Sequence, residues 1–461
     1  MSAPTVAVVG GGQLARMMQE EASALGVHLR ALVEAPDGSA AAVIPDAPVG
    51  AAGDEAAVRA LLAGRPGSAD PLWAGAAQVL TFEHEHQDAA LLERLQAEGI
   101  SVQPSAQALE LARDKLAMRR AMSAAGLPQP AWAELSGSAE QMRAAVLAFA
   151  QDHGWPVVLK TPRGGYDGHG VLLVHEAAEL EAGEAAQWLK ATAAARAGQA
   201  SGGAGAEQPA GGGGSLGGGA VSSLLVEEAI PFTRELAVLL ARSPSGELRA
   251  WPVAQTRQVD GICAQVVAPA PGLDAQAVAR AQAVGRQVAE SFGVTGVLAV
   301  EIFAVERASE PVALYINELA MRPHNSGHWT QDGAVTSQFA QHLRAVLDLP
   351  LGSTAPVAPA TVMVNLLGGV QEPGPQALRQ ALALEPEAQV HLYGKGWRTG
   401  RKLGHVNLRV PGPAGSEPTP QAVQETLERA CAVVAILRGE SPELGENAPR
   451  PAAFSIESGK S

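Results

Sequence analysis

The sequence of 461 residues predicts an α/β protein of three domains. Its length exceeds the roughly 100–200 residues of one compact domain. Short apolar runs with strand character alternate along it with stretches of helical spacing, which is typical of α/β folds. We expect domains at residues 1–104, 105–355 and 356–438, followed by a flexible polar tail at residues 439–461.

Composition and charge exclude several classes of protein. No apolar run approaches the roughly 20 residues that cross a bilayer, so we expect no membrane partner. The formal net charge of −14 argues against a nucleic-acid partner, because binding to phosphates requires clustered Lys and Arg. The N-terminus lacks the basic region of a secretory leader, and Cys263 and Cys431 share no CxxC spacing. These features favour a reducing cytoplasm.

The first domain opens with a strand, a glycine turn and a helix. Residues 6–9 are an apolar run, glycines occupy positions 10–12, and helical spacing follows. This pattern predicts a Rossmann-like domain in which the helix N-terminus faces an anion. A further strand at residues 79–82 ends in polar residues, for which a solvated strand end and a ligand contact are equally supported. These residues are Glu83, His84, Glu85 and His86.

The second domain begins with a helical stretch at residues 108–126 and a strand that ends in Lys160. The residues that follow this lysine include Gly164, Gly165, Gly168 and Gly170. Glycines let backbone amides approach an anion closely, and a neighbouring lysine can bridge phosphates. A plain hairpin would explain the glycines but not the lysine, so we predict a phosphate-binding hairpin. Residues 190–223, rich in Gly, Ala and Ser, predict a disordered insertion.

Several later strands contain carboxylates within or beside apolar runs. Glu227 and Glu228 end one strand and Glu235 begins the next, a pattern that suits either a nucleoside site or solvated glutamates. Glu301 lies within an apolar strand, and Glu318 follows Asn317 in another. Burying a carboxylate costs several kcal/mol unless it is paired or binds a metal. If the two strands are neighbours, their oxygens suit Mg²⁺.

The segment after Glu318 concentrates polar side chains in a short stretch. It contains Arg322, His324, Asn325, Ser326 and His328. The four-residue spacing of the two histidines suggests zinc, but Pro323 and Gly327 argue against the helix that such a site requires, and the glutamate of HExxH is missing.

Four sequence blocks together carry a resemblance to a known family. They are GGGQLARMM, GGYDGHG, RPHNSGHWTQDGAVTSQFAQHLRAVLDLPL and YGKGWRTGRKLGHVNL. With these blocks the chain resembles the ATP-grasp superfamily and, within it, the 5-(carboxyamino)imidazole ribonucleotide synthases. The resemblance implies a central ATP-grasp domain between a Rossmann-like N-terminal domain and a small C-terminal domain. It also implies a homodimer.

The resemblance implies a reaction in purine (IMP) biosynthesis. MgATP phosphorylates bicarbonate to carboxyphosphate, and the amine of 5-aminoimidazole ribonucleotide is carboxylated, leaving ADP and phosphate. The implied cofactors are therefore ATP and Mg²⁺. Two other readings remain open: another ATP-grasp ligase, such as a formate-dependent glycinamide ribonucleotide transformylase, and a nucleotide-binding regulator without catalysis.

The resemblance also implies roles for individual residues. Lys115 and Lys160 would meet the ATP phosphates, and Glu301 and Glu318, with Asn317, would hold magnesium. The phosphate lid would comprise Gly164, Gly165, Tyr166, Asp167, Gly168, His169 and Gly170, with Tyr166 and Asp167 closing over the reactants. Adenosine would be held by Glu227, Glu228, Ala229, Ile230, Glu235 and Gln258.

The remaining implied roles concern bicarbonate and the ribonucleotide. Arg322 would clamp bicarbonate or carboxyphosphate in a pocket that excludes water. His324, Asn325 and Ser326 would orient the ribonucleotide and help to move a proton. The 5′-phosphate would be bound by Gly12, Gln13, Lys395, Arg401 and Lys402. The chain departs from the family's usual pattern at Met321, where proline is common, and at Lys115, where arginine is common.

Overall fold

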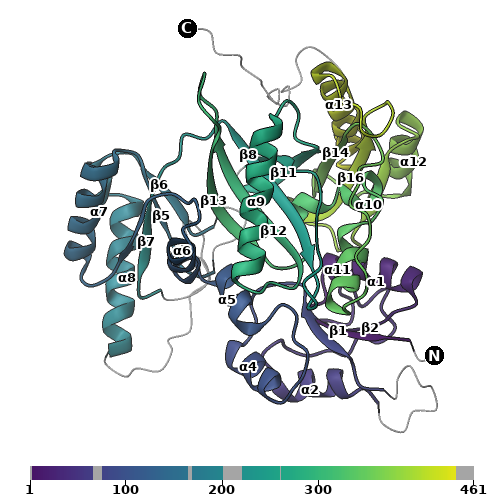
Figure 1. The fold of residues 1–461 in the computed structure, drawn as a ribbon, viewed down its shortest axis with the longest axis horizontal. Helices are drawn as coiled ribbons and strands as arrows, with labels where there is room; N and C mark the ends of the chain where they lie inside the picture. Colours follow the sequence, from purple (N-terminus) through teal and green to yellow (C-terminus); the bar gives the residue numbers. More distant parts are fainter. Residues whose placement is uncertain (1–2, 66–74, 165–168, 201–220, 260, 443–461) are drawn as a thin grey trace.

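The computed structural model describes residues 3–65, 75–164, 169–200, 221–259 and 261–442. In this part of the chain the strands form three sheets, as Figure 1 shows. One belongs to the N-terminal domain, one is a small antiparallel sheet on the left of the view, and the largest runs through the middle of the molecule. This arrangement confirms the predicted α/β fold class.

The N-terminal sheet is parallel, with the strand order β2-β1-β3. Its elements are β1 (Thr5–Val9), α1 (Gln13–Leu25), β2 (His28–Leu32), α2 (Glu55–Ala63), β3 (Val79–Phe82) and α4 (Ala89–Ala97). Alternate residues of β1 enter different cores: Val6 and Val8 pack on the side of α1, whereas Ala7 and Val9 pack on the side of α2 and α4. The predicted Rossmann-like domain is therefore present.

The second sheet is antiparallel, with the order β4-β7-β5-β6. Its strands are β4 (Trp132–Leu135), β5 (Val157–Lys160), β6 (Val171–Val174) and β7 (Leu224–Glu228). The helices α7 (Ala139–His153), η1 (Ala177–Leu180) and α8 (Glu184–Ala200) pack against it. Before this sheet come α5 (Ala106–Arg113) and α6 (Lys115–Ala124).

Two expectations for this region require correction. The helical stretch at 108–126 is divided between α5 and α6, because the Asp114 carboxylate accepts the Ala117 N–H and starts a second helix. The insertion does not begin at residue 190, because α8 continues to Ala200 and Thr192 is buried. Alanine is the strongest helix former, which explains the extension. Residues 201–220 of the insertion lie outside the described residues, as do residues 443–461 of the tail.

The largest sheet has nine strands and joins the central and C-terminal regions. Its order is β13-β12-β8-β10-β11-β14-β16-β15, and β9 pairs with β8. The strands are β8 (Arg234–Arg242), β9 (Leu248–Ala250), β10 (Ala254–Val259), β11 (Ile262–Ala268), β12 (Gly296–Val305), β13 (Ala313–Ala320), β14 (Thr361–Leu367), β15 (Gln389–Leu392) and β16 (Lys402–Arg409). Because β14 pairs with β11, the C-terminal strands extend the central sheet.

Helices cover this large sheet at several places. They are α9 (Ala275–Ser291), η2 (Asn325–Gly327), α10 (Thr330–Gly333), α11 (Gln338–Val346), α12 (Pro375–Leu384) and α13 (Pro420–Leu437). Helix α9 packs on β8 and β12, whereas α12 and α13 pack on the C-terminal strands. Helix α11 connects the domains, since its Phe339 and Leu343 join the core of the N-terminal domain.

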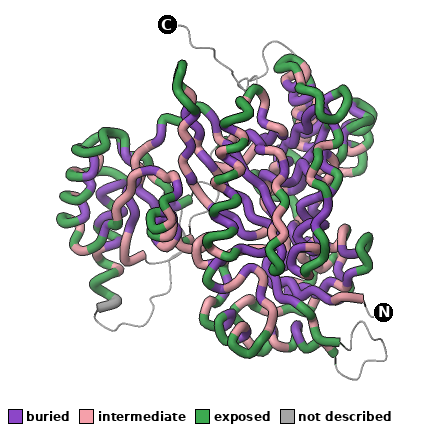
Figure 2. Tube along the Cα trace, in the orientation of Figure 1, coloured by how far each residue is buried: buried purple, intermediate pink, exposed green. Residues whose placement is uncertain are grey.

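Burial follows this layering. Figure 2 shows that buried segments concentrate in the strands, while the exposed segments lie mainly on the outer helices and loops. Among the described residues, no helix combines the length and the apolar character needed to cross a membrane.

Candidate active site

Two glutamates face each other at the edge of the large sheet. Glu301 of β12 and Glu318 of β13 are direct cross-strand partners, and the register then shifts so that Asn317 has no partner on β12. This β-bulge lets neighbouring residues turn toward the same side, which a regular strand forbids. The Asn317 Oδ1 atom accepts a 3.1 Å hydrogen bond from Lys160 of the small sheet. The bulge therefore directs the amide toward the opposing sheet.

The two carboxylates differ in their tendency to ionise. Burial, together with the nearby Glu318 charge, raises the pKa of Glu301 to about 8. Burial also opposes ionisation of Glu318, but the Lys115 and Lys160 ammonium groups hold its pKa below the ordinary value. Lys115 Nζ lies 2.5 Å from Glu318 Oε1. Two carboxylates and an amide oxygen are the hard ligands that Mg²⁺ takes, so these residues fit that ion.

A buried ion-pair network fixes Lys160. Glu227 Oε2 lies 2.8 Å from Lys160 Nζ, and Glu227 Oε1 lies 2.6 Å from Arg119 Nε. Arg119 is fully buried and also donates to the carbonyl oxygens of Ile316 and Asn317. These cations lower the pKa of Glu227 to about 2 even though burial opposes ionisation. Arg119 thus joins the small sheet to the edge strand of the large sheet.

This network changes what the sequence predicted. The Glu227 carboxylate forms ion pairs with Arg119 and Lys160, so the contact with adenosine predicted for Glu227 would fall to its backbone. Arg119 itself was missed, since it sits in an Arg-Arg pair on a helix that reads as amphipathic. Its only local signal is its position on the apolar face of α6, between the buried Met118 and Met122.

The other residues predicted to hold adenosine lie along β7, β8 and the linker between them. Glu228 and Ala229 are partly exposed and Ile230 is buried. Burial raises the pKa of Glu235, and its Oε2 accepts the backbone N–H of Gln258 at 3.3 Å. Glu235 is opposite Phe303 in the β8–β12 ladder, two residues along β12 from Glu301, so both carboxylates share one face of the sheet.

The predicted phosphate lid is described only at its ends. Gly164 and Gly170 both have positive φ, and Thr161 N–H donates to the Gly170 carbonyl at 2.9 Å, closing the β5–β6 hairpin. His169 is exposed. Four predicted lid residues lie outside the described residues: Gly165, Tyr166, Asp167 and Gly168.

Arg322 and His324 follow β13 directly. Arg322 forms a two-point ion pair with Glu85 from the N-terminal domain, with Nε 2.7 Å from Oε2 and Nη2 3.3 Å from Oε1. The Arg322 guanidinium lowers the pKa of Glu85 to about 2, against the effect of burial. Glu85 belongs to the strand end whose role the sequence left open. The structure therefore shows that this strand end enters the site.

The turn of η2 holds the His324 ring. The Ser326 hydroxyl lies 2.8 Å from Nδ1, and the Ser326 N–H also donates to this atom. Burial and the Arg322 charge lower the pKa of His324 to about 3, so the ring is neutral. Since Nδ1 accepts, the proton resides on Nε2, 3.5 Å from Glu301 Oε1. Asn325 points elsewhere, because its amide donates to the Cys263 carbonyl.

His328 does not share a site with His324. Its Nδ1 atom bonds to the Gln338 amide at 2.8 Å, and its ring stacks on His405. Burial lowers the pKa of His328 well below the ordinary value. The zinc alternative is therefore not supported, because each ring is bound by different neighbours.

The C-terminal cations meet the N-terminal glycine turn. Lys395 Nζ donates to Gln13 Oε1, across 382 positions of sequence. Burial and the charges of Arg401 and Lys402 lower the pKa of Lys395. Arg401 is exposed and donates to the Gly396 carbonyl at 2.9 Å. The Lys402 charge also lowers the pKa of His324, so this cationic cluster acts on the turn that contains His324.

Gly12 requires a correction. Its backbone N–H donates to Glu83 Oε2 at 2.7 Å, and the Ala15 N–H donates to the same oxygen at 3.0 Å. A carboxylate therefore already caps the N-terminus of α1, where the sequence predicted an anion-binding turn. A Cβ on Gly12 would lie 2.0 Å from Glu83 Oε1, so glycine is needed for this close approach. Gln13 remains at the site through its side chain.

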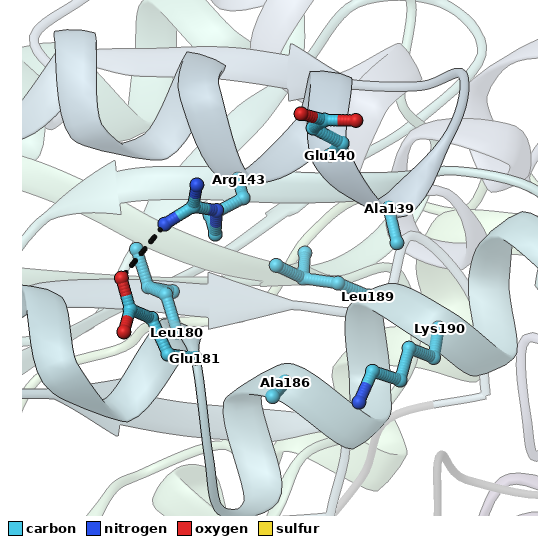
Figure 3. Close-up of a pocket in the computed structure, with 8 residues that line it drawn as sticks. All are labelled: Ala139, Glu140, Arg143, Leu180, Glu181, Ala186, Leu189 and Lys190. Carbon is cyan, nitrogen blue, oxygen red and sulfur yellow. Dashed lines mark hydrogen bonds and ion pairs between the residues drawn. The ribbon is translucent and has the colours of Figure 1, made fainter.

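The hollow drawn in Figure 3 is separate from this site. It is an open surface depression between α7, η1 and α8, on the outer side of the small sheet. Its lining residues include Arg143 and Glu181, which form a 3.0 Å ion pair across it. None of the residues predicted from the sequence lines it.

Comparisons with known proteins agree with this geometry. Three family models match: the ribonucleotide synthetase preATP-grasp domain at residues 3–113, the ATP-grasp domain at 120–339, and the phosphoribosylaminoimidazole carboxylase C-terminal domain at 361–411. The chain is 46% identical over 409 residues to the N5-carboxyaminoimidazole ribonucleotide synthase of Mycobacterium tuberculosis, covering 88% of this chain and 83% of that protein.

Solved structures show the same fold. The N5-carboxyaminoimidazole ribonucleotide synthetase of Thermus thermophilus has a TM-score of 0.72 at 33% identity, covering 95% of this chain and 99% of that one. The Aspergillus clavatus synthase, solved with ADP and 5-aminoimidazole ribonucleotide, has a TM-score of 0.73 at 28% identity with the same coverage. The chain therefore belongs to the N5-carboxyaminoimidazole ribonucleotide synthase family of ATP-grasp ligases, which act in purine biosynthesis.

Proposed function

We propose that this enzyme carboxylates 5-aminoimidazole ribonucleotide with bicarbonate and ATP, giving N5-carboxyaminoimidazole ribonucleotide, ADP and phosphate. One observation carries the proposal. The carboxylates of Glu301 and Glu318 lie opposite each other, and the chain continues from Glu318 into the turn at residues 322–326. The His324 ring of this turn faces Glu301. A phosphoryl-transfer site and an acceptor site are therefore contiguous.

The nucleotide would lie between the small sheet and the large sheet. Lys115 and Lys160 supply positive charge for its phosphates, and Glu301, Glu318 and Asn317 would hold Mg²⁺. Bound Mg²⁺ would neutralise charge on the phosphates during transfer. Adenosine would contact Glu228, Ala229, Ile230, Glu235 and Gln258, while the lid at residues 164–170 covers the phosphates. Glu227 acts by holding Lys160 in place.

Arg322 is the cation at the start of this turn, and we assign it to bicarbonate and carboxyphosphate. Its partner Glu85 already orients the guanidinium, so an incoming anion meets a donor that needs little reorganisation. The neutral His324 ring presents an N–H from Nε2, and Ser326 fixes that ring from the other side. These two residues orient the acceptor amine. Asn325 shapes the turn by bonding to the Cys263 carbonyl.

The ribonucleotide 5′-phosphate would bind the cationic cluster of Lys395, Arg401 and Lys402. Gln13 supports the cluster by accepting from Lys395. The pKa of Lys395 is lowered by burial and also by repulsion from Arg401 and Lys402, and a bound dianion would offset both effects. We also propose a homodimer in the cytoplasm, with domain limits near residues 104 and 355. In the described part of the chain neither Cys263 nor Cys431 forms a disulfide, which agrees with that compartment.

The test is ADP release from MgATP and bicarbonate, with and without 5-aminoimidazole ribonucleotide. We expect release to be stimulated by the ribonucleotide and not by glycinamide ribonucleotide with formate. Stimulation by the second pair alone would replace the proposed substrate with that of another ATP-grasp ligase. Tight ATP binding without any stimulated release would instead indicate a regulator.

A further inference from the structure

Helix α11 begins with a buried glutamine whose side-chain amide hydrogen-bonds to the backbone of the turn that contains His324. Gln338 Oε1 accepts the His324 N–H at 2.8 Å, and Gln338 Nε2 donates to the His324 carbonyl at 2.8 Å. The side chain is fully buried. One amide thus bonds to both backbone groups of the residue whose ring faces Glu301.

A third bond completes the contacts of this amide. The second hydrogen of Gln338 Nε2 points to His328 Nδ1, 2.8 Å away. Rotating the amide by half a turn would place oxygen against oxygen at the His324 carbonyl and leave the His324 N–H without an acceptor. The two His324 backbone groups therefore fix the amide orientation, and His328 Nδ1 is then the acceptor for the remaining hydrogen.

The start of α11 is anchored to the same turn by two further contacts. The Gln338 N–H donates to the Thr330 hydroxyl at 2.9 Å, and this hydroxyl donates to the Gly327 carbonyl at 2.6 Å. A Cβ on Gly327 would lie 2.5 Å from Gln338 Oε1, so the turn and the amide approach as closely as glycine allows. The turn at residues 324–330 and the first turn of α11 form one hydrogen-bonded unit.

We propose that Gln338 is a positioning residue for the ribonucleotide, acting through His324. The inference rests on the proposed function of the His324 turn. Gln338 does not contact the phosphate-binding cations or the Glu301 and Glu318 pair in any interaction described above. Its hydrogen bonds act on the His324 turn, so we expect a larger effect on the ribonucleotide than on ATP. Misplacement of an orienting group by about 1 Å can reduce turnover on the order of 100-fold.

The same helix supplies a matched control. Gln341, one turn further along α11, is also fully buried. Its Nε2 donates to the Gly352 carbonyl at 2.9 Å, and its Oε1 accepts the Gly352 N–H at 2.7 Å. Like Gln338, Gln341 bonds to both backbone groups of one residue, but that residue lies in the segment after α11. Gln338→Glu removes the amide donor that bonds to His324 and His328, and Gln341→Glu removes the amide donor that bonds to Gly352, each from a fully buried position.

The experiment compares these two variants with the wild-type chain. It measures the melting temperature, the MgADP affinity by calorimetry, and the KM for 5-aminoimidazole ribonucleotide. We expect similar losses of melting temperature in both variants and unchanged MgADP affinity. Only Gln338→Glu should raise the ribonucleotide KM or lower kcat, by on the order of 10- to 100-fold. If either Glu variant does not fold, Gln338→Met and Gln341→Met provide the same comparison.

Equal ribonucleotide kinetics in the two variants would overturn the inference, as would a loss of MgADP affinity as large as the kinetic effect in Gln338→Glu. Either result leaves the proposed function intact as long as the wild-type chain turns over the ribonucleotide. A wild-type chain whose ADP release ignores the ribonucleotide would overturn the proposed function, and the inference with it.

Discussion

At the scale of single residues, the candidate site is a balance between partly buried carboxylates and the cations that face them. The Lys115 ammonium and the Lys160 ammonium keep Glu318 ionised, whereas Glu301 is protonated more easily. A divalent cation between the two glutamates would favour ionisation of both. Glu318 is therefore ionised both without and with the divalent cation.

Removing Glu318 should therefore abolish most of the turnover. We predict that Glu318→Ala lowers kcat by on the order of 10²–10⁴-fold, because a charge clamp on phosphoryl transfer contributes several kcal/mol. Glu134→Ala is the control, since this carboxylate on β4 pairs with Arg120 away from the site. The measurement is steady-state ADP release. Near-native kcat in Glu318→Ala would exclude the metal assignment.

Glu227 has a structural role that pH can test. Its pKa is lowered to about 2 in the folded protein, from an ordinary value of 4.5. Its contribution to stability is therefore complete above pH 4.5 and is lost as pH falls toward 2. We predict that Glu227→Gln lowers the free energy of unfolding at pH 7 by about 3–5 kcal/mol, since Arg119 and Lys160 lose their partner.

Denaturant unfolding at pH 7 and at pH 3 provides the measurement. The difference between wild type and Glu227→Gln should shrink at the lower pH. A difference that stays the same at both pH values would show that folding does not lower the pKa of this carboxylate.

At the scale of elements, local sequence was sufficient for most strands and insufficient for the contacts between them. The strand at residues 79–82 was predicted with its observed limits, because three apolar residues and the β-branched Thr81 lie between polar flanks. The pairing of Glu301 with Glu318 was anticipated from two apolar strands with one carboxylate each. The bulge at Asn317 was not, since a register shift depends on the partner strand.

Contacts distant in sequence account for the remaining differences. Glu85 and Arg322 are 237 positions apart, and Arg119 and Glu227 are 108 positions apart. A charged residue on a helix or strand end carries no local sign of a partner so far away. The prediction that the glycine turn binds an anion failed at Gly12 for the same reason. The Gly12 N–H binds the Glu83 carboxylate, which is 71 positions away in the sequence.

The contact between Lys395, which follows β15, and Gln13 at the N-terminal glycine turn provides a test of the phosphate site. Lys395→Ala removes a cation that touches Gln13. We predict a rise in the KM for 5-aminoimidazole ribonucleotide with little change in the KM for ATP, because the lysine lies in the cationic cluster and not beside Glu318. Arg409→Ala, at the end of β16, is the control. An unaltered ribonucleotide KM in Lys395→Ala would move the phosphate site elsewhere.

At the scale of the whole molecule, one buried histidine connects the N-terminal sheet, the large sheet and α11. His342 Nδ1 accepts the Val297 N–H at 3.1 Å, so Nε2 carries the proton toward the Thr81 hydroxyl at 2.9 Å. Burial lowers the pKa of His342 to about 3 from an ordinary 6.5. The contact therefore requires a neutral ring.

The sign of the pH effect follows from this shift. Below pH 6.5 the unfolded chain binds a proton at His342 and the folded chain does not, so stability is present above pH 6.5 and falls as pH decreases. One such group contributes about 1.4 kcal/mol per pH unit. We predict that His342→Asn is less stable at pH 7.5 but has a shallower pH dependence between pH 6 and 4.5. Parallel stability curves for the two proteins would contradict this.

The central claim is that this chain joins bicarbonate carbon to the exocyclic amine of 5-aminoimidazole ribonucleotide at the expense of ATP. The most direct measurement is ¹³C NMR of a turnover mixture that contains ¹³C-bicarbonate. We predict a new carbamate carbon signal that requires both MgATP and the ribonucleotide and that is absent with Glu318→Ala. ADP formation without any carbamate signal would contradict the claim.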